Sequence, residues 1–96
     1  MWNIPASTTS LPEGVSGASA ELPDGSKQTN GQPGNGGNFG YRGPCAGPGL
    51  SHHYTFELFA IDQKADLPAT ATRADVTKAI DGHIVGHAML VTLFHH

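Results

Sequence analysis

Glycine and proline are distributed unevenly along this chain, and their distribution limits the possible folds more than any other feature. Eleven of the thirteen glycines and most of the seven prolines lie within residues 6–50. Turn-forming triplets recur there, at residues 12–14 (PEG), 23–25 (PDG) and 35–37 (NGG). This segment has almost no apolar periodicity, which a helix or a strand requires. Regular structure is therefore expected mainly outside it.

Two interpretations of residues 6–50 follow from composition. A segment rich in glycine, proline and polar residues is typical of a disordered linker. A long segment without regular structure in a compact domain is alternatively an ordered surface loop that carries function. Composition alone favours neither interpretation over the other.

The second half of the chain shows the periodicity of β-strands. Residues 53–61 alternate as a strand does, and residues 84–94, the longest apolar run, predict a second strand in the middle of a sheet. Residues 1–4 (MWNI) are typical of the end of a further strand, which Pro5 terminates. The strand at residues 53–61 has one face that consists of Tyr54, Phe56, Leu58 and Ala60.

A short helix is predicted between the two strands, over residues 72–81. Thr72 is a suitable N-cap, and Asp75 places a carboxylate in the first turn, where the helix dipole favours it. Gly82 is typical of the residue that follows the end of a helix. Two strands, a strand end and one helix are too few elements to enclose a core alone.

Length and charge narrow the class of protein. Ninety-six residues suffice for one small domain, which we expect to span residues 1–96. The five Lys and Arg residues are scattered and the net charge is −3, which disfavours nucleic acid and anionic membrane surfaces as partners. The single cysteine, Cys45, excludes an intrachain disulfide.

Targeting signals are not evident in the sequence. No apolar run approaches the roughly 20 residues that a membrane-spanning helix needs. The first residues, MWNIP, have neither the basic nor the apolar region of a secretory signal. We therefore expect a soluble protein with a cytoplasmic location.

Six segments resemble, in order and spacing, the motifs of one known family. They are residues 2–6 (WNIPA), 11–14 (LPEG), 38–45 (NFGYRGPC), 52–56 (HHYTF), 58–62 (LFAID) and 81–84 (DGHI). The family patterns that they resemble are, in the same order, V-x-N-I-P-A, L-P-E-G, D-F-G-x-x-G-Y-x-G-P-C-P-P, H-R-Y-x-F, L-Y-A-L-D and M-E-G-H-V. These patterns belong to the phosphatidylethanolamine-binding-protein (PEBP) family, in its bacterial YbhB/YbcL-like branch, and the resemblance is to the carboxy-terminal part of the family fold.

The resemblance implies a mainly β fold, with an antiparallel Greek-key sheet and one short peripheral helix, whose amino-terminal strands are missing from this chain. It implies that residues 6–50 form an ordered loop that runs over a ligand site. It also implies a binding protein, in some members a regulatory one, rather than a well-defined enzyme. The implied ligand is a small anion, either phosphate or a phosphorylated headgroup, and no cofactor is implied.

The chain departs from the family pattern at several positions. The family's acidic D-P-D-x-P motif and a pocket histidine belong to the part of the fold upstream of Met1. Ala46 and Gly47 stand where the family has two prolines, and His53 stands where it has an arginine. A pocket made by this chain alone is expected to be open on one side. We expect a second copy to complete the sheet as a homodimer, because an uncovered strand edge is a template for pairing.

The resemblance transfers a ligand-binding role to seven positions: Gly43, Pro44, Cys45, Ala46, Gly47, His52 and Tyr54. A glycine-rich turn offers exposed backbone N–H groups, His52 offers a ring donor and Tyr54 offers a phenolic hydroxyl. Each residue also has a purely structural interpretation. Without the resemblance, Tyr54 is a core residue, His52 an ordinary surface histidine and Cys45 a small buried residue.

Metal binding and catalysis have weaker support. The adjacent residues His52 and His53 point to opposite faces of a strand, and the sequence has no HExxH motif and no Cys/His zinc spacing. It has no GxSxG motif or P-loop either. Two alternatives to a binding protein stay open: a minor hydrolytic or lyase activity with His52 as general base, and a truncated fragment without ligand function.

Overall fold

The computed structural model describes residues 1–29, 39–45, 47–68 and 70–95. Its regular elements are β1 (Ser51–Ile61), α1 (Arg73–Ile80) and β2 (Ile84–His95), in that order along the chain. The chain divides into two compact units. The helix unit consists of Met1–Arg42 and Lys64–Asp81, and the strand unit consists of Gly43–Gln63 and Gly82–His96.

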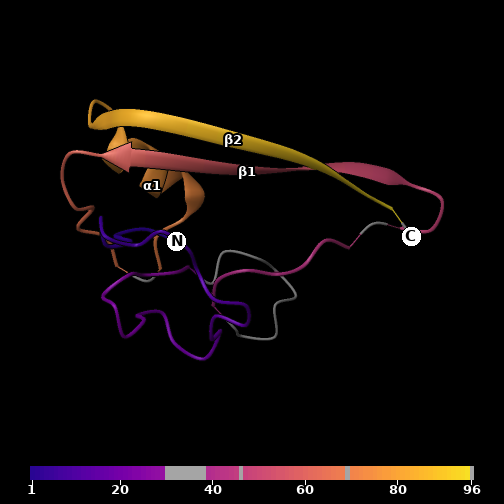
Figure 1. Cartoon of the computed structure of the whole chain (residues 1–96), viewed down its shortest axis with the longest axis horizontal. Coiled ribbons are helices and arrows are strands. Elements are labelled where there is room, and N and C mark those ends of the chain that lie inside the picture. Colours follow the sequence, from indigo (N-terminus) through magenta and orange to yellow (C-terminus); the bar gives the residue numbers. More distant parts are fainter. Residues whose placement is uncertain (30–38, 46, 69, 96) are drawn as a thin grey trace. The chain divides into compact units, whose positions relative to one another are not determined.

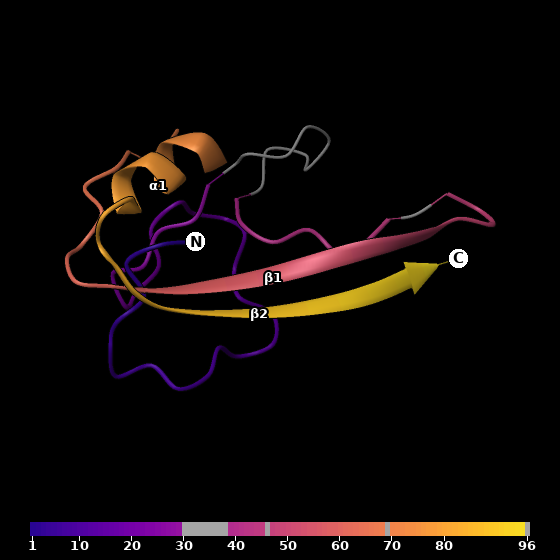
Figure 2. The same ribbon diagram turned by 90° about the horizontal axis from the view of Figure 1, so that it is seen from above.

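The strand unit is built on β1 and β2, which run side by side as one long antiparallel pair (Figures 1 and 2). The predicted mainly β fold class is confirmed, since the described residues form this pair and one short helix. The predicted position of β2 in the middle of a sheet is not found among the described residues. In the described part of the chain each strand has a single neighbour, because no third strand lies beside the pair.

The register of the pair defines two faces. It runs from Ser51 opposite His95 to Ala60 opposite Gly86, after which Val85 is an extra residue that forms a β-bulge. We call the first face the Tyr54 face. It consists of His52, Tyr54, Phe56, Leu58 and Ala60 with their partners Phe94, Thr92, Leu90, Ala88 and Gly86. The opposite, Phe59 face consists of His53, Thr55, Glu57 and Phe59 with their partners Leu93, Val91, Met89 and His87.

Both faces expose large apolar side chains. Leu58 on the Tyr54 face is 62% exposed, and Leu93 on the Phe59 face is 66% exposed. A single pair of strands has no second layer to cover either face, and such a hairpin is at best marginally stable in water. The strand unit therefore leaves large apolar side chains exposed on both of its faces.

The helix unit has a small core around Trp2. Trp2 is 4% exposed, and the cluster around it consists of Ala65 and Ala71 with Leu67, Val76 and Ala79 packed against them. Trp2 exchanges two backbone hydrogen bonds with Lys27, of 2.8 and 2.9 Å. The predicted strand end over residues 1–4 is wrong, because in the described part of the chain Trp2 forms an isolated bridge and no strand. Asn3 has φ +57°, which turns the backbone out of the extended conformation directly after Trp2.

A buried amide organises the glycine-rich segment of the helix unit. The Gln28 side chain is almost fully buried, and its Nε2 donates hydrogen bonds to the carbonyl oxygens of Ser16 and Ser19. Gly40 packs directly on this amide with φ +79°, so that an added Cβ would collide with it. Polar contacts, rather than apolar side chains, hold these turns together.

Local capping sets the limits of α1. The Thr72 hydroxyl accepts a hydrogen bond from the Asp75 backbone N–H, and the Asp75 carboxylate accepts one from the Thr72 N–H, which together form a capping box. Gly82 follows the helix with φ +79°. The predicted helix over residues 72–81 is therefore confirmed, with Thr72 as its N-cap and Asp81 as its C-cap. Among the described residues, no helix has the length and hydropathy to cross a membrane.

We predict that Asn3→Ala strongly destabilises the helix unit. The Asn3 Nδ2 group donates to the Ala65 carbonyl oxygen and Asn3 Oδ1 accepts from the Ala65 N–H, both at 2.8 Å. Losing both bonds at a half-buried residue, with alanine at positive φ, should lower the free energy of unfolding by about 2–4 kcal/mol. Urea denaturation measures it, and Asn3→Asp, which keeps the acceptor, should lose about half as much. A change below about 0.5 kcal/mol for Asn3→Ala would contradict this role.

We predict that Asp75 contributes pH-dependent stability. The hydrogen bonds from the Thr72 backbone and side chain, and then the charge of Lys78, hold the pKa of Asp75 below its ordinary value. A lowered pKa means that the contribution is complete above the ordinary value of 3.8 and is lost as the pH falls through the folded-state pKa. The difference in unfolding free energy between wild type and Asp75→Asn should therefore be constant from pH 7 to 5 and shrink below pH 4. A difference that stays constant down to pH 2 would contradict it.

Candidate functional site

Three of the predicted site residues come together where the loop at residues 43–50 meets the start of β1. The Tyr54 hydroxyl oxygen accepts a hydrogen bond from the Cys45 backbone N–H at 3.2 Å. His52 lies on the same face of β1 as Tyr54, with 6.4 Å between the ring centroids. The loop is thus joined to the strand by a contact between two of the residues that the sequence singled out.

The other predicted residues lie in the same loop. Gly43 is exposed and Pro44 is half-buried, immediately before Cys45. The Gly47 carbonyl accepts a hydrogen bond from the Leu50 N–H at 3.1 Å, which closes a turn. Ala46 lies outside the described residues. The part that these loop residues play in ligand binding stays a prediction.

Two residues of β2 also contact Tyr54, and the sequence did not predict them as part of this site. Phe94 packs edge-on against Tyr54, with ring centroids 6.3 Å apart and planes at 84°. The Thr92 hydroxyl donates to the Tyr54 carbonyl oxygen at 3.3 Å. The alternation of residues 84–94 could have placed both on one face, but only the register shows that this face is shared with Tyr54.

Hydrogen-bond donors are available at this site. The Tyr54 oxygen accepts from Cys45, which uses a lone pair and not the O–H, so that the hydroxyl keeps its capacity to donate to a ligand. His52 is exposed and offers a second donor from its ring. The Cys45 thiol is exposed too, contrary to the buried position that its residue type suggests. The arrangement suits an acceptor-rich ligand, such as an oxyanion, that receives bonds from both rings.

Two other histidines pair with carboxylates in the strand unit. His83 Nδ1 lies 2.8 Å from Asp62 Oδ1, and the Asp62 N–H donates to the His83 carbonyl at 3.0 Å. His87 stacks on Phe59 at 4.6 Å between ring centroids, with its Nε2 3.5 Å from Glu57 Oε2. These pairs join the two strands. Within the described residues, no three His, Cys, Asp or Glu side chains are grouped as metal ligands would be.

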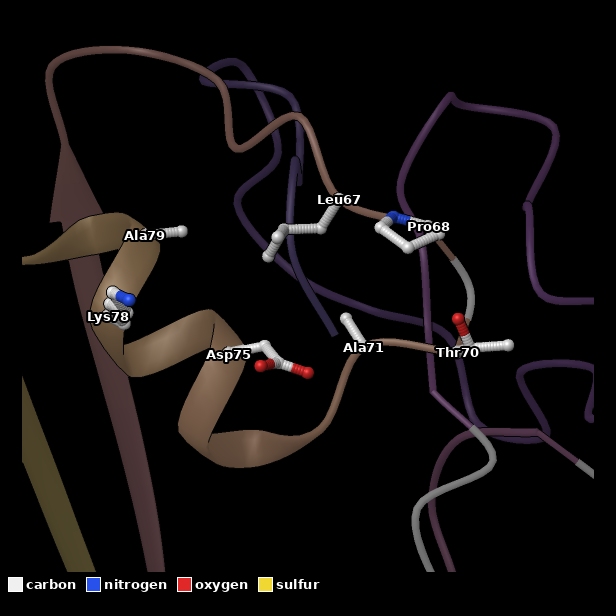
Figure 3. Close-up of a pocket in the computed structure, with 7 residues that line it drawn as sticks. All are labelled: Leu67, Pro68, Thr70, Ala71, Asp75, Lys78 and Ala79. Atoms are coloured by element: carbon white, nitrogen blue, oxygen red, sulfur yellow. The ribbon is translucent and has the colours of Figure 1, made fainter.

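The helix unit has a hollow of its own, of about 470 Å³ (Figure 3). Its charged groups are Lys78 and Asp75, and the Asp75 carboxylate is already bonded to Thr72. No residue of the predicted ligand site lines it. The lining residues are Leu67, Pro68, Thr70, Ala71, Asp75, Lys78 and Ala79.

The fold and the site define a mainly β chain whose candidate ligand site lies where a glycine-rich loop joins a strand. The sequence comparison gives the family. The family model described as "Phosphatidylethanolamine-binding protein" matches residues 1–95, and the chain belongs to this family. The resemblance found in the sequence motifs is thus confirmed.

Named relatives agree with this assignment. The chain is 43% identical over 94 residues to a UPF0098 protein of Methanothermobacter thermautotrophicus, a match that covers 98% of this chain and 59% of the relative. It is 31% identical over 93 residues to the UPF0098 protein YbhB of Escherichia coli, with 96% of this chain and 57% of the relative covered. The chain spans about half the length of the curated relatives it matches. No solved structure matches.

We predict that Tyr54→Phe loosens the loop at residues 43–50 without unfolding the strand unit. The variant keeps the ring that packs on Phe94 but removes the acceptor for the Cys45 N–H. Since one such bond contributes about 0.5–1.5 kcal/mol, the Cys45 amide should exchange its hydrogen about 2- to 10-fold faster. Hydrogen exchange followed by NMR measures the rate, with the Leu50 amide as an internal control. Equal exchange rates for Cys45 in both proteins would contradict this anchoring role.

Proposed function

We propose that this chain is part of a PEBP-like binding protein that recognises a small anion, either phosphate or a phosphorylated headgroup. The candidate site is formed by residues 43–47 together with His52 and Tyr54. The observation that carries the proposal is the hydrogen bond from the Cys45 N–H to the Tyr54 oxygen. This bond fixes the phenolic O–H beside His52, so that two donors lie on one face.

The charge distribution around the site supports an anionic ligand. The chain has a net charge of −3, yet residues 43–56 contain no Asp or Glu. The next carboxylate along β1 is that of Glu57, which belongs to the Phe59 face and not to the Tyr54 face. An anion on the Tyr54 face therefore meets donors without a carboxylate from this stretch beside it.

Self-association is the second part of the proposal. The strand unit exposes apolar side chains on both faces of a sheet that, as far as the chain is described, consists of two strands. Exposed apolar patches of this kind mark surfaces that contact another molecule. A homodimer of the chain supplies such a contact, and we place the protein in the cytoplasm, where the exposed Cys45 thiol stays reduced.

The binding proposal predicts a site-specific response to inorganic phosphate. In a titration followed by ¹⁵N NMR, the amides of residues 43–54 should shift in a saturable manner. His52→Ala should weaken binding about 5- to 10-fold, because one donated hydrogen bond is lost. His53→Ala is the matched control, since the neighbouring ring lies on the opposite face, and it should bind as wild type does.

The same titration distinguishes the two ligand sources. Phosphoethanolamine that binds more tightly than phosphate would identify a headgroup site, whereas equal affinities would identify a phosphate site. Chloride at matched ionic strength separates specific binding from screening. Absence of saturable shifts, or equal losses in the His52 and His53 variants, would overturn the proposed function.

A further inference from the structure

Burial within the strand unit is concentrated at the end that carries the candidate ligand site. On β1 the half-buried residues are Tyr54 and Ile61, and the remaining residues of that strand are exposed. On β2 the half-buried residues are Gly86, Thr92 and Phe94. Thr92 and Phe94 both contact Tyr54. Side-chain packing in this unit is therefore tightest around the proposed donor Tyr54.

The strand register places Phe94 next to both proposed donors. Phe94 lies directly opposite His52, and it is the diagonal neighbour of Tyr54, whose own partner is Thr92. Diagonal neighbours in an antiparallel pair are within reach of aromatic side chains. The rings of Phe94 and Tyr54 meet at 84°, with 6.3 Å between their centroids, which is the edge-to-face arrangement that aromatic rings favour. Because a phenylalanine side chain has no hydrogen-bonding group, Phe94 can affect an oxyanion through these donors.

Contacts at the backbone, the ring and the tip hold the Tyr54 side chain. The Thr92 hydroxyl donates to the Tyr54 carbonyl oxygen at 3.3 Å, and Phe94 packs against the ring. The Cys45 N–H donates to the phenolic oxygen at 3.2 Å. A tyrosine side chain turns about two torsions, so a ring without the Phe94 contact is able to rotate away from this position. The ring contact therefore keeps the hydroxyl within reach of Cys45.

We propose that Phe94 is a positioning residue of the anion site, which holds the Tyr54 ring so that the phenolic O–H and the His52 ring serve one ligand. The inference rests on the proposed function and adds to the site a residue without a polar side chain. A mobile side chain loses conformational freedom when a ligand binds, whereas one that is already held loses little. Phe94 therefore raises the affinity for an oxyanion without donating a hydrogen bond to it.

Replacement of Phe94 tests this role first without a ligand. Phe94→Ala should speed hydrogen exchange of the Cys45 amide about 2- to 10-fold, because the edge-to-face contact no longer holds the acceptor of its hydrogen bond. Phe94→Leu, which keeps most of the apolar volume but no ring, should act in the same direction. Phe94→Tyr should restore the wild-type rate. Leu93→Ala is the matched control, because this neighbour lies on the Phe59 face and is 66% exposed.

A titration with inorganic phosphate then measures binding by ¹⁵N NMR. Phe94→Ala should weaken binding about 2- to 10-fold, and Leu93→Ala should not. A double-mutant cycle tests whether Phe94 acts through the Tyr54 hydroxyl. In a Tyr54→Phe background, Phe94→Ala should cause no further loss, because the hydroxyl that it positions is absent. Unchanged amide shifts at Leu58 and Ala88, a cross-strand pair away from the site, show that the strand unit stays folded.

The outcomes separate this inference from the proposed function. Equal Cys45 exchange rates in wild type, Phe94→Ala and Phe94→Leu would overturn the inference, and so would additive losses in the double-mutant cycle. Saturable phosphate binding that Phe94→Ala leaves unchanged would overturn it too, with the proposed function intact. Faster Cys45 exchange in Phe94→Ala, in a protein without saturable phosphate shifts, would overturn the proposed function and leave the hold of Phe94 on Tyr54 supported.

Discussion

Apolar strands that one pair of neighbours cannot cover are the main constraint on this chain. β1 and β2 satisfy each other's inner backbone groups, but they place Leu58, Met89, Leu90 and Leu93 in water. At about 25 cal/mol per Å² of apolar surface, each such side chain forgoes a large part of the 1.5–3 kcal/mol that full burial provides. The helix unit buries its own core around Trp2, Ala65 and Ala71, with Ile80 also buried, and that core covers none of these four strand residues. Burial of the exposed apolar side chains of β1 and β2 is therefore the largest gain in stability that is still open to the strand unit.

Structural features that depend on residues close together in the sequence could be predicted from it. The alternation of residues 53–61 reflects a repeat of two and gives β1 and its faces correctly. The caps of α1 involve residues three apart, Thr72 and Asp75, and are equally local. The prediction of a strand end at residues 1–4 was wrong. Among the described residues, the β contact of this segment is the isolated bridge between Trp2 and the distant Lys27, and a positive φ at Asn3 turns the chain directly afterwards. Neither feature leaves a local pattern in the sequence.

The residues of the candidate site also fall into those that local patterns predict and those that they do not. Alternation places His52 and Tyr54 on one face, so their proximity follows from a local rule. The roles of Phe94 and Thr92 depend on which residue of β2 lies opposite Tyr54, and that register is set across the intervening connection and α1. A shift by one residue would have moved Phe94 to the other face. The burial of Gln28 is also non-local, since a polar residue in a glycine-rich segment gives no sign that the carbonyls of Ser16 and Ser19 will surround its amide.

The proposed ligand binding is linked to the covering of the apolar strand faces through the Tyr54 face. The donors at His52 and Tyr54 occupy one end of this face, and the exposed apolar pair of Phe56 and Leu90 follows directly along the strands. A hydrogen bond to an anion is weak where water competes for the same donors, and it strengthens as the surroundings become less polar. Any molecule that covers Phe56 and Leu90 therefore lowers the local dielectric constant beside the donors. By the same linkage, an anion that binds only the covered state stabilises that state by RT ln(1 + [L]/Kd), where [L] is the concentration of free anion and Kd is its dissociation constant.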